Sequence, residues 1–279
     1  MGSPTRGTMV TPPSMVKDSA TLQGNNGDAS LPPRPGDTTE DRILGGRIVL
    51  RQPRVGYRAG LDAALLAAAV ELKPGERALE AGCGAGAALL QTAYRSPGAA
   101  LVGLERDSSV LGLAHINIVL NGMGERIEAL HGDVALRLPA LGGSAFDAAF
   151  ANPPFFDDPN ALRAPHPSKE GAWIADGGLG AWTAFLLKVV KEGGRITVIH
   201  RADRLGDLLT GLGEGAGSFR IRPIHPFADE PAKRVLVRAV KTGKAPLVLL
   251  PPLVIHDREG AKHTPETEAI LRGEAAVEW

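Results

Sequence analysis

The sequence predicts an α/β fold with a Rossmann-like, mostly parallel sheet and helices on both faces. Apolar segments at residues 101–105, 127–133 and 146–151 have the length and composition of buried strands. Segments with helical spacing, such as residues 108–121, alternate with them. This alternation is typical of parallel sheets, whose ligands lie at the carboxyl ends of the strands.

The size and composition of the chain narrow its class. At 279 residues and 43% hydrophobic, it is long enough for one α/β domain of about 200 residues with extensions. A formal net charge of zero argues against an extensive nucleic-acid coat, although a local basic face remains possible. The single cysteine, and the lack of an apolar run of roughly 18 residues, favour a cytoplasmic protein without a membrane partner. The seven histidines show no paired ligand spacing, so we expect no metal.

The chain divides into a tail and one domain. Residues 1–40 are rich in Pro, Gly, Ser and Thr and contain no aromatic residue, which predicts a disordered N-terminal tail. Residues 41–279 then form a single domain, with residues 41–75 as a lead-in and residues 76–279 as the core and C-terminal extension. In the lead-in, Gly45 and Gly46 predict a hairpin.

A helix is expected next, at residues 63–72, with Asp62 as its N-cap. After the strand at residues 146–151 comes a polar loop, residues 157–176, of a length typical of functional lids. The later elements are expected as helices at 178–191, 204–212 and 264–272, a strand at 195–200, and an antiparallel edge pair at 219–224 and 234–240.

The glycine-rich turn at residues 78–86 is the centre of the predicted site. An apolar strand runs through Glu80 into Gly82, Gly84 and Gly86, and a helix follows. Glycines allow the tight turn and let a ligand lie against the main chain, so the pattern predicts a nucleotide-like ligand. The dinucleotide pattern of dehydrogenases also fits here.

Acidic residues follow two further strands. Glu105 lies 23 residues after Gly82, where an acid can hold ribose hydroxyls, and Asp133 ends the next strand. These residues and Asn152 all follow strand ends, so we expect them to meet in one crevice. Cys83 lies within the turn without an evident histidine partner, so we expect no catalytic thiol.

The fourth strand ends in a tetrapeptide suited to methyl transfer onto a planar nitrogen. The lone pair of an amine on an aromatic ring is delocalised, so the amine is a poor nucleophile. The side-chain oxygen of Asn152 and the carbonyl of Pro153 could accept its two N–H bonds, and Pro153 and Pro154 would hold these acceptors in place. Phe155 offers a flat face for stacking. Hydride transfer requires no such tetrapeptide.

These motifs resemble class I S-adenosylmethionine-dependent methyltransferases that carry an Asn-Pro-Pro-Phe/Tyr motif. The closer resemblance is to the tRNA adenine-N6 methyltransferases of the valine-tRNA type. It rests on residues 44–48, 56–68, 152–156, 178–182, 199–201 and 232–238 together with the glycine turn.

The resemblance implies a seven-stranded sheet with an antiparallel last strand, S-adenosylmethionine as cofactor and tRNA as partner. It implies catalytic roles for Asn152, Pro153, Pro154 and Phe155. It implies cofactor-binding roles for Asp62, Glu80, Gly82, Cys83, Gly84, Gly86, Glu105, Arg106, Asp133 and Val134.

Several alternatives remain open at this point. Relatives with the same tetrapeptide modify guanine in ribosomal RNA, protein glutamine or small amines. A non-catalytic RNA-binding protein on this scaffold and an NAD oxidoreductase are weaker alternatives from other classes. Six basic residues could contact phosphates or could be ordinary surface charges: Arg51, Arg54, Arg58, Lys233, Arg234 and Arg238.

Overall fold

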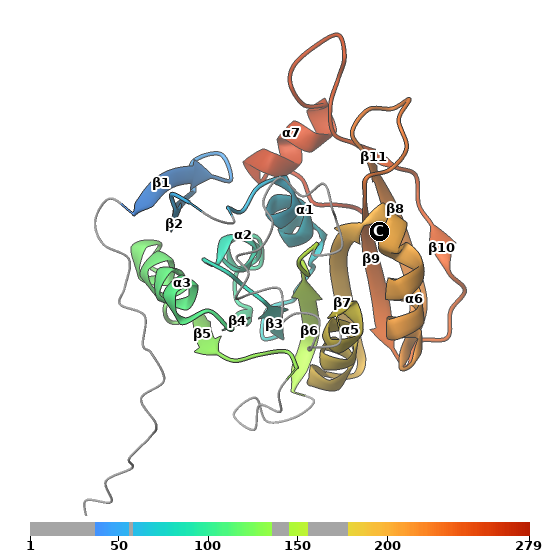
Figure 1. The fold of residues 1–279 in the computed structure, drawn as a ribbon, viewed down its shortest axis with the longest axis horizontal. Coiled ribbons are helices and arrows are strands. Elements are labelled where there is room, and N and C mark those ends of the chain that lie inside the picture. Colours follow the sequence, from blue (N-terminus) through green and yellow to red (C-terminus); the bar gives the residue numbers. More distant parts are fainter. Residues whose placement is uncertain (1–36, 56–57, 136–144, 156–177) are drawn as a thin grey trace, which may run out of the picture.

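The computed structural model describes residues 37–55, 58–135, 145–155 and 178–279 (Figure 1). Within these ranges, nine strands form the main sheet and two form a separate hairpin. Most of the expected tail, residues 1–36, and the whole expected loop, residues 157–176, lie outside the described ranges. The first strand begins at Thr38, slightly before the expected start of the domain at residue 41.

The strands are β1 Thr38–Ile43, β2 Ile48–Pro53, β3 Arg77–Ala81, β4 Ala100–Glu105, β5 Ile127–His131, β6 Phe146–Ala151, β7 Val190–Arg201, β8 Ala216–His225, β9 Arg234–Lys241, β10 Val248–Leu249 and β11 Leu253–Val254. The helices are α1 Leu61–Ala69, α2 Ala87–Arg95, α3 Ser108–Leu120, α5 Gly178–Val189, α6 Leu205–Gly213 and α7 Pro265–Arg272. A short 3-10 helix, Ala202–Arg204, precedes α6.

The sheet is mostly parallel, as expected. Its order is β10-β8-β9-β7-β6-β3-β4-β5, and β11 also pairs with β8. Strands β5, β4, β3, β6 and β7 are parallel, while β9 is antiparallel to both β7 and β8. The seven long strands and the antiparallel pair confirm the predicted Rossmann-like architecture. The two-residue strands β10 and β11 extend the β8 edge, and Pro251 and Pro252 separate them.

Helices cover both faces of the sheet, as Figure 1 shows. One core cluster joins the sheet to α1, α2, α3, α7 and the β1–β2 hairpin through residues such as Leu65, Leu89 and Ile270. The other cluster joins the opposite face to α5 and α6 through Phe185, Leu208 and Leu212. Burial of these apolar side chains on both faces is the main stabilising contribution to such a three-layer fold.

The β1–β2 hairpin is held against α3 by two side-chain amides. Oδ1 of Asn121 accepts a hydrogen bond from the Val49 N–H at 2.9 Å, and Oδ1 of Asn117 accepts one from the Arg51 N–H at 2.8 Å. Their Nδ2 groups donate to the carbonyls of the same two β2 residues. These amides pair β2 with a helix much as a neighbouring strand would, because they satisfy its N–H and C=O groups.

The expected N-cap of α1 was wrong. The helix begins at Leu61 with Gly60 as its N-cap, and no side chain caps it. Asp62 therefore lies inside the first turn, where its carboxylate accepts a hydrogen bond from Arg234 Nε at 3.2 Å. A carboxylate inside the first helical turn still interacts favourably with the helix dipole.

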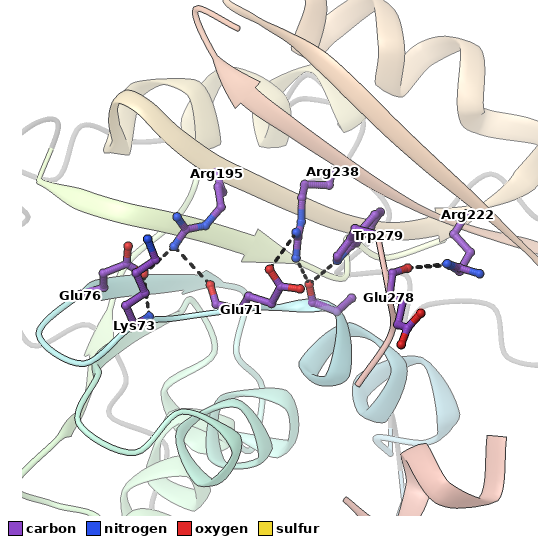
Figure 2. Close-up of polar contacts among 9 residues, drawn as sticks. Glu71, Lys73, Glu76, Arg195, Arg222, Arg238, Glu278 and Trp279 are labelled. Atoms are coloured by element: carbon purple, nitrogen blue, oxygen red, sulfur yellow. Dashed lines mark hydrogen bonds and ion pairs between the residues drawn. The ribbon is translucent and has the colours of Figure 1, made fainter. Parts of the chain in front are cut away.

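The other end of α1 is completed by residues distant in the chain (Figure 2). The Ala68 carbonyl accepts from the Val277 N–H at 2.9 Å. The Ala69 carbonyl accepts from Trp279 Nε1 at 2.9 Å and Arg238 Nη2 at 2.7 Å. The Arg238 guanidinium also lies 4.4 Å from the Trp279 ring centroid. The last carbonyls of a helix lack partners within it, so these contacts replace hydrogen bonds that α1 cannot make itself.

A second group of contacts in Figure 2 fixes the connection from α1 to β3. Arg195 Nη2 pairs with Glu76 Oε2 at 2.5 Å and donates to the Glu71 carbonyl at 3.2 Å. Arg222 Nε donates to the Glu278 carbonyl at 3.0 Å. Arg195 of β7 thus holds the segment before β3, while Arg222 of β8 holds the segment that contains Glu278.

Candidate active site

The register of the sheet brings the predicted site residues to one edge. Ala81 pairs with Leu104 on one side and with Ala151 on the other. Gly82, Glu105 and Asn152, which follow these residues, therefore leave three adjacent strands at the same level. Glu105 in turn pairs with His131 on β5, two residues before Asp133. The carboxyl ends of these strands therefore lie together at one edge of the sheet.

The three glycines of the turn all have positive φ, but their surroundings differ. At Gly82, with φ of 68°, a Cβ would lie 2.5 Å from Cη2 of Trp182, so the indole packs directly on the turn. At Gly84, with φ of 57°, a Cβ would meet nothing within 4 Å. Gly86 precedes α2 as its N-cap with φ of 89°. Trp182 is therefore a packing residue, while the open space at Gly84 leaves the main chain accessible to a ligand.

Two carboxylates lie beside this turn. Glu105 accepts the Gly84 N–H at 2.9 Å through Oε2 and the Asp107 N–H at 2.8 Å through Oε1. Glu80 is buried, and its Oε2 has no hydrogen-bond partner among the described residues. Burial, together with the neighbouring Glu105 carboxylate, raises the pKa of Glu80 well above its usual value. Glu105 thus stabilises the turn through its hydrogen bonds, and the buried Glu80 Oε2 next to the turn is an acceptor without a partner among the described residues.

A third carboxylate, that of Asp133, lies at the same edge of the sheet, just after the end of β5. Asp133 Oδ1 accepts the Ala135 N–H at 2.9 Å, and Oδ2 pairs with Arg106 Nη1 at 3.2 Å. The Arg106 carbonyl contacts the His131 ring at 2.9 Å. Val134 is half-buried and packs against the core on the α5 face. Arg106 and Asp133, which were predicted to share the cofactor site, are therefore in direct contact.

Cys83 lies inside the turn and is buried. Its backbone N–H donates to the Leu104 carbonyl at 2.9 Å. A Cβ on Gly103 would lie 2.7 Å from its sulfur, so the thiol packs tightly against β4. Burial and the carboxylates of Glu80 and Glu105 raise the pKa of the thiol well above its usual value. A protonated, tightly packed thiol is a poor nucleophile.

The tetrapeptide at residues 152–155 leaves β6 next to three residues from other elements. The Phe155 ring lies 5.1 Å from the His200 ring, measured between centroids, with an interplanar angle of 50°. The Arg234 guanidinium carbon lies 4.5 Å from the centre of the Phe155 ring. Arg234 also binds Asp62, as described above. The structure thus places the predicted acceptor platform within a group of residues from α1, β7 and β9.

His200 is a buried histidine within this group. Its exposed fraction is 4%, and its Nδ1 has no hydrogen-bond partner among the described residues. Burial first, and then the positive charges of Arg204, Arg234 and Arg201, lower the pKa of His200 from 6.5 to about 4. The imidazole is consequently neutral at physiological pH.

This depressed pKa predicts acid sensitivity. Stability from a neutral buried histidine is complete above the unfolded pKa and is lost as pH falls from 6.5 to about 4. By the same linkage the full effect is roughly 3 kcal/mol in the free energy of unfolding. Urea unfolding of the parent and of His200→Gln at pH 7 and pH 5 should show a smaller acid loss in the variant. His115→Gln, which removes a histidine bonded to the Ala129 carbonyl, is the control and should keep the parental loss.

Several predicted basic contacts have other roles. Arg51 pairs with Glu40, and Arg58 pairs with Asp41. Arg238, with an exposed fraction of 9%, is buried between α1 and Trp279, so neither of the two alternatives left open for it, a phosphate contact or an ordinary surface charge, describes it. The contact of Arg234 with Phe155 was not expected, because nothing in the sequence links residues so far apart.

Residues 48–164 match the family described as the methyltransferase small domain. A predicted O-methyltransferase from Agrobacterium tumefaciens has a similar structure, with a TM-score of 0.65 and 28% identity over 77% of this chain and 98% of that chain. The domain match and the shared fold show that this chain is similar to methyltransferases.

The curated relatives share the name of one specific enzyme. The chain is 27% identical over 198 residues to a tRNA1(Val) (adenine(37)-N6)-methyltransferase from Porphyromonas gingivalis, covering 68% of this chain and 77% of the relative. A protein of the same name from a Flavobacteriaceae bacterium is 29% identical over 112 residues, covering 40% of this chain. That match spans 47% of the relative, about half of its length.

No described helix combines the length and apolar character needed to cross a bilayer. No group of three or more His, Cys, Asp or Glu side chains in the described ranges is arranged to hold a metal ion.

Proposed function

We propose that the chain transfers the methyl group of S-adenosylmethionine to the exocyclic N6 amine of an adenine in tRNA. The observation that carries this proposal is the position of the tetrapeptide at residues 152–155. It leaves β6 beside the glycine turn on β3, so an acceptor held by Asn152 lies next to a ligand held by Gly82 and Gly84. The names of the curated relatives support adenine and tRNA as the acceptor.

The cradle at the turn fits the proposed cofactor. A side chain at Gly84 would meet no protein atom within 4 Å, so space is available against the main chain. Buried Glu80 has an acceptor oxygen without a partner, which suits the ammonium group of an amino acid. Glu105 would hold the ribose hydroxyls, and Asp133 with Arg106 and Val134 would border the adenine. When bound, S-adenosylmethionine supplies an electrophilic methyl group.

The residues of the chain then bind and orient the acceptor. The Asn152 side-chain oxygen and the Pro153 carbonyl accept the two N–H bonds of the target amine, which localises its lone pair toward the methyl group. The target base is flipped out of the nucleic-acid stack into the site, where it stacks on the ring of Phe155. Fixing the amine in line with the methyl carbon provides a large part of the rate increase.

The direct test is methyl transfer to tRNA. Labelled S-adenosylmethionine and the purified chain are incubated with total tRNA from a strain lacking the gene, and the nucleosides are analysed by mass spectrometry. We expect N6-methyladenosine in one tRNA. Label in ribosomal RNA, protein glutamine or a small amine would overturn the tRNA assignment, and intact RNA binding without any transfer would indicate a non-catalytic RNA-binding protein.

A further inference from the structure

We propose that Arg234, held by Asp62, is a positioning residue of the acceptor site that fixes the ring of Phe155. The inference rests on the proposed function, because it assigns Phe155 to the acceptor. It also gives Asp62 a role toward the acceptor through Arg234, rather than toward the cofactor.

Arg234 is anchored on three sides. Its Nε donates to Asp62 Oδ2 at 3.2 Å, its Nη1 donates to the Lys233 carbonyl at 3.0 Å, and its guanidinium carbon lies 4.5 Å from the Phe155 ring centre. The side chains of Arg234 and Asp62 are 32% and 22% exposed, so the pair is partly shielded from water. A planar guanidinium held in this way has little rotational freedom.

The tetrapeptide needs such an anchor. Pro153 and Pro154 restrict the backbone, but they do not restrict the side-chain torsions of the next residue. Phe155 is half-buried, so packing alone does not fix its ring. The cation–π contact with Arg234 and the tilted contact with His200 supply the missing restraint.

An ordered ring matters because stacking transmits its orientation to the acceptor. The guanidinium covers part of the Phe155 surface, which reduces the number of ways in which a planar base can stack there. With fewer stacked orientations available, a larger fraction of the bound bases has its amine directed at the methyl group. Loss of Arg234 should therefore weaken productive acceptor binding and leave cofactor binding nearly unchanged.

The first experiment observes the ring without any substrate. The full chain is labelled with 4-fluorophenylalanine, and the resonance of Phe155 is assigned with Phe155→Leu. Arg234→Met and Asp62→Asn should shift or broaden this resonance in ¹⁹F spectra. Arg258→Met is the matched control, because Arg258 lies 4.2 Å from the Phe227 ring and pairs with Asp229 and Glu230. It should change the Phe227 resonance alone. A Phe155 resonance unchanged by both Arg234→Met and Asp62→Asn would overturn the proposal.

The second experiment uses kinetics with unmodified valine tRNA transcript. Arg234→Met should raise the KM for the transcript about 10- to 100-fold, with the affinity for S-adenosylmethionine within about twofold by calorimetry. Arg234→Lys should restore part of this loss. In the Phe155→Leu background, Arg234→Met should add little. A full additional loss there would show that Arg234 binds the RNA directly and would overturn the positioning role.

The two experiments separate this inference from the proposed function. If the parent chain transfers no methyl group to tRNA, the proposed function fails, while the ¹⁹F spectra still decide whether Arg234 and Asp62 order Phe155. If transfer occurs but Arg234→Met lowers cofactor affinity as much as transcript affinity, the inference fails alone.

Discussion

Asn152→Ala is expected to lower the rate of methyl transfer about 10²- to 10³-fold, because it removes an acceptor that acts on the target amine in the transition state. The affinity for S-adenosylmethionine should stay within about twofold, since the proposed partner of this side chain is the acceptor. Single-turnover transfer to tRNA, with calorimetry for the cofactor, measures both quantities.

Asn121→Ala is a useful control for this variant. It also removes a side-chain amide, but one that binds Val49 in the β1–β2 hairpin. It should reduce stability by about 1–3 kcal/mol because the β2 groups lose their partner, without a matching loss in the rate of transfer. If Asn152→Ala weakened cofactor binding as much as transfer, the acceptor role of Asn152 would be untenable.

Glu105→Ala is expected to weaken cofactor binding about 10²-fold. The dissociation constant of the cofactor should rise, while the rate of the chemical step should change little. Two causes act together. The variant loses the proposed acceptor for the ribose hydroxyls, and hydrogen bonds to charged groups contribute about 1.5–3 kcal/mol each. It also removes the acceptor of the Gly84 and Asp107 N–H groups, so the turn itself loosens.

Calorimetry of cofactor binding tests this prediction, with thermal unfolding of the ligand-free protein to follow the turn. Glu128→Ala, on the neighbouring strand β5 and exposed, is the matched control and should change neither quantity appreciably. Unchanged cofactor affinity in Glu105→Ala would exclude the ribose role, and a change confined to the melting temperature would leave Glu105 as a structural residue of the turn.

Local signals were sufficient for much of the fold. The helix at residues 108–121 was predicted almost to the residue from the helical spacing of its apolar residues; in the structure Asp107 caps it and Asn121 ends it. The terminal helix was predicted equally well, with Thr264 as its cap. Strand ends also located Gly82, Glu105 and Asn152 at one edge, since parallel strands share a direction.

Tertiary contacts decided the features that were missed. The helix expected at residues 178–191 ends at Val189, and β7 begins at Val190 rather than at residue 195. A Cβ on Gly194 would lie 2.9 Å from the Asp147 carbonyl, so glycine lets the strand pass close to β6, where the register shifts. Asp62 has the position of a cap in the sequence, yet it binds Arg234, which is 172 residues away. Spacing along one sequence does not reveal such a pair.

The completion of α1 by residues 277–279 has a consequence for how the chain reaches its fold during synthesis. The ribosome makes α1 early, but the partners of the Ala68 and Ala69 carbonyls emerge more than 160 residues later. Until then the apolar face that α1 shares with α7 has no cover from the last helix. In a nascent chain the Ala68 and Ala69 carbonyls of α1 therefore lack these partners until Arg238, Val277 and Trp279 have been synthesised.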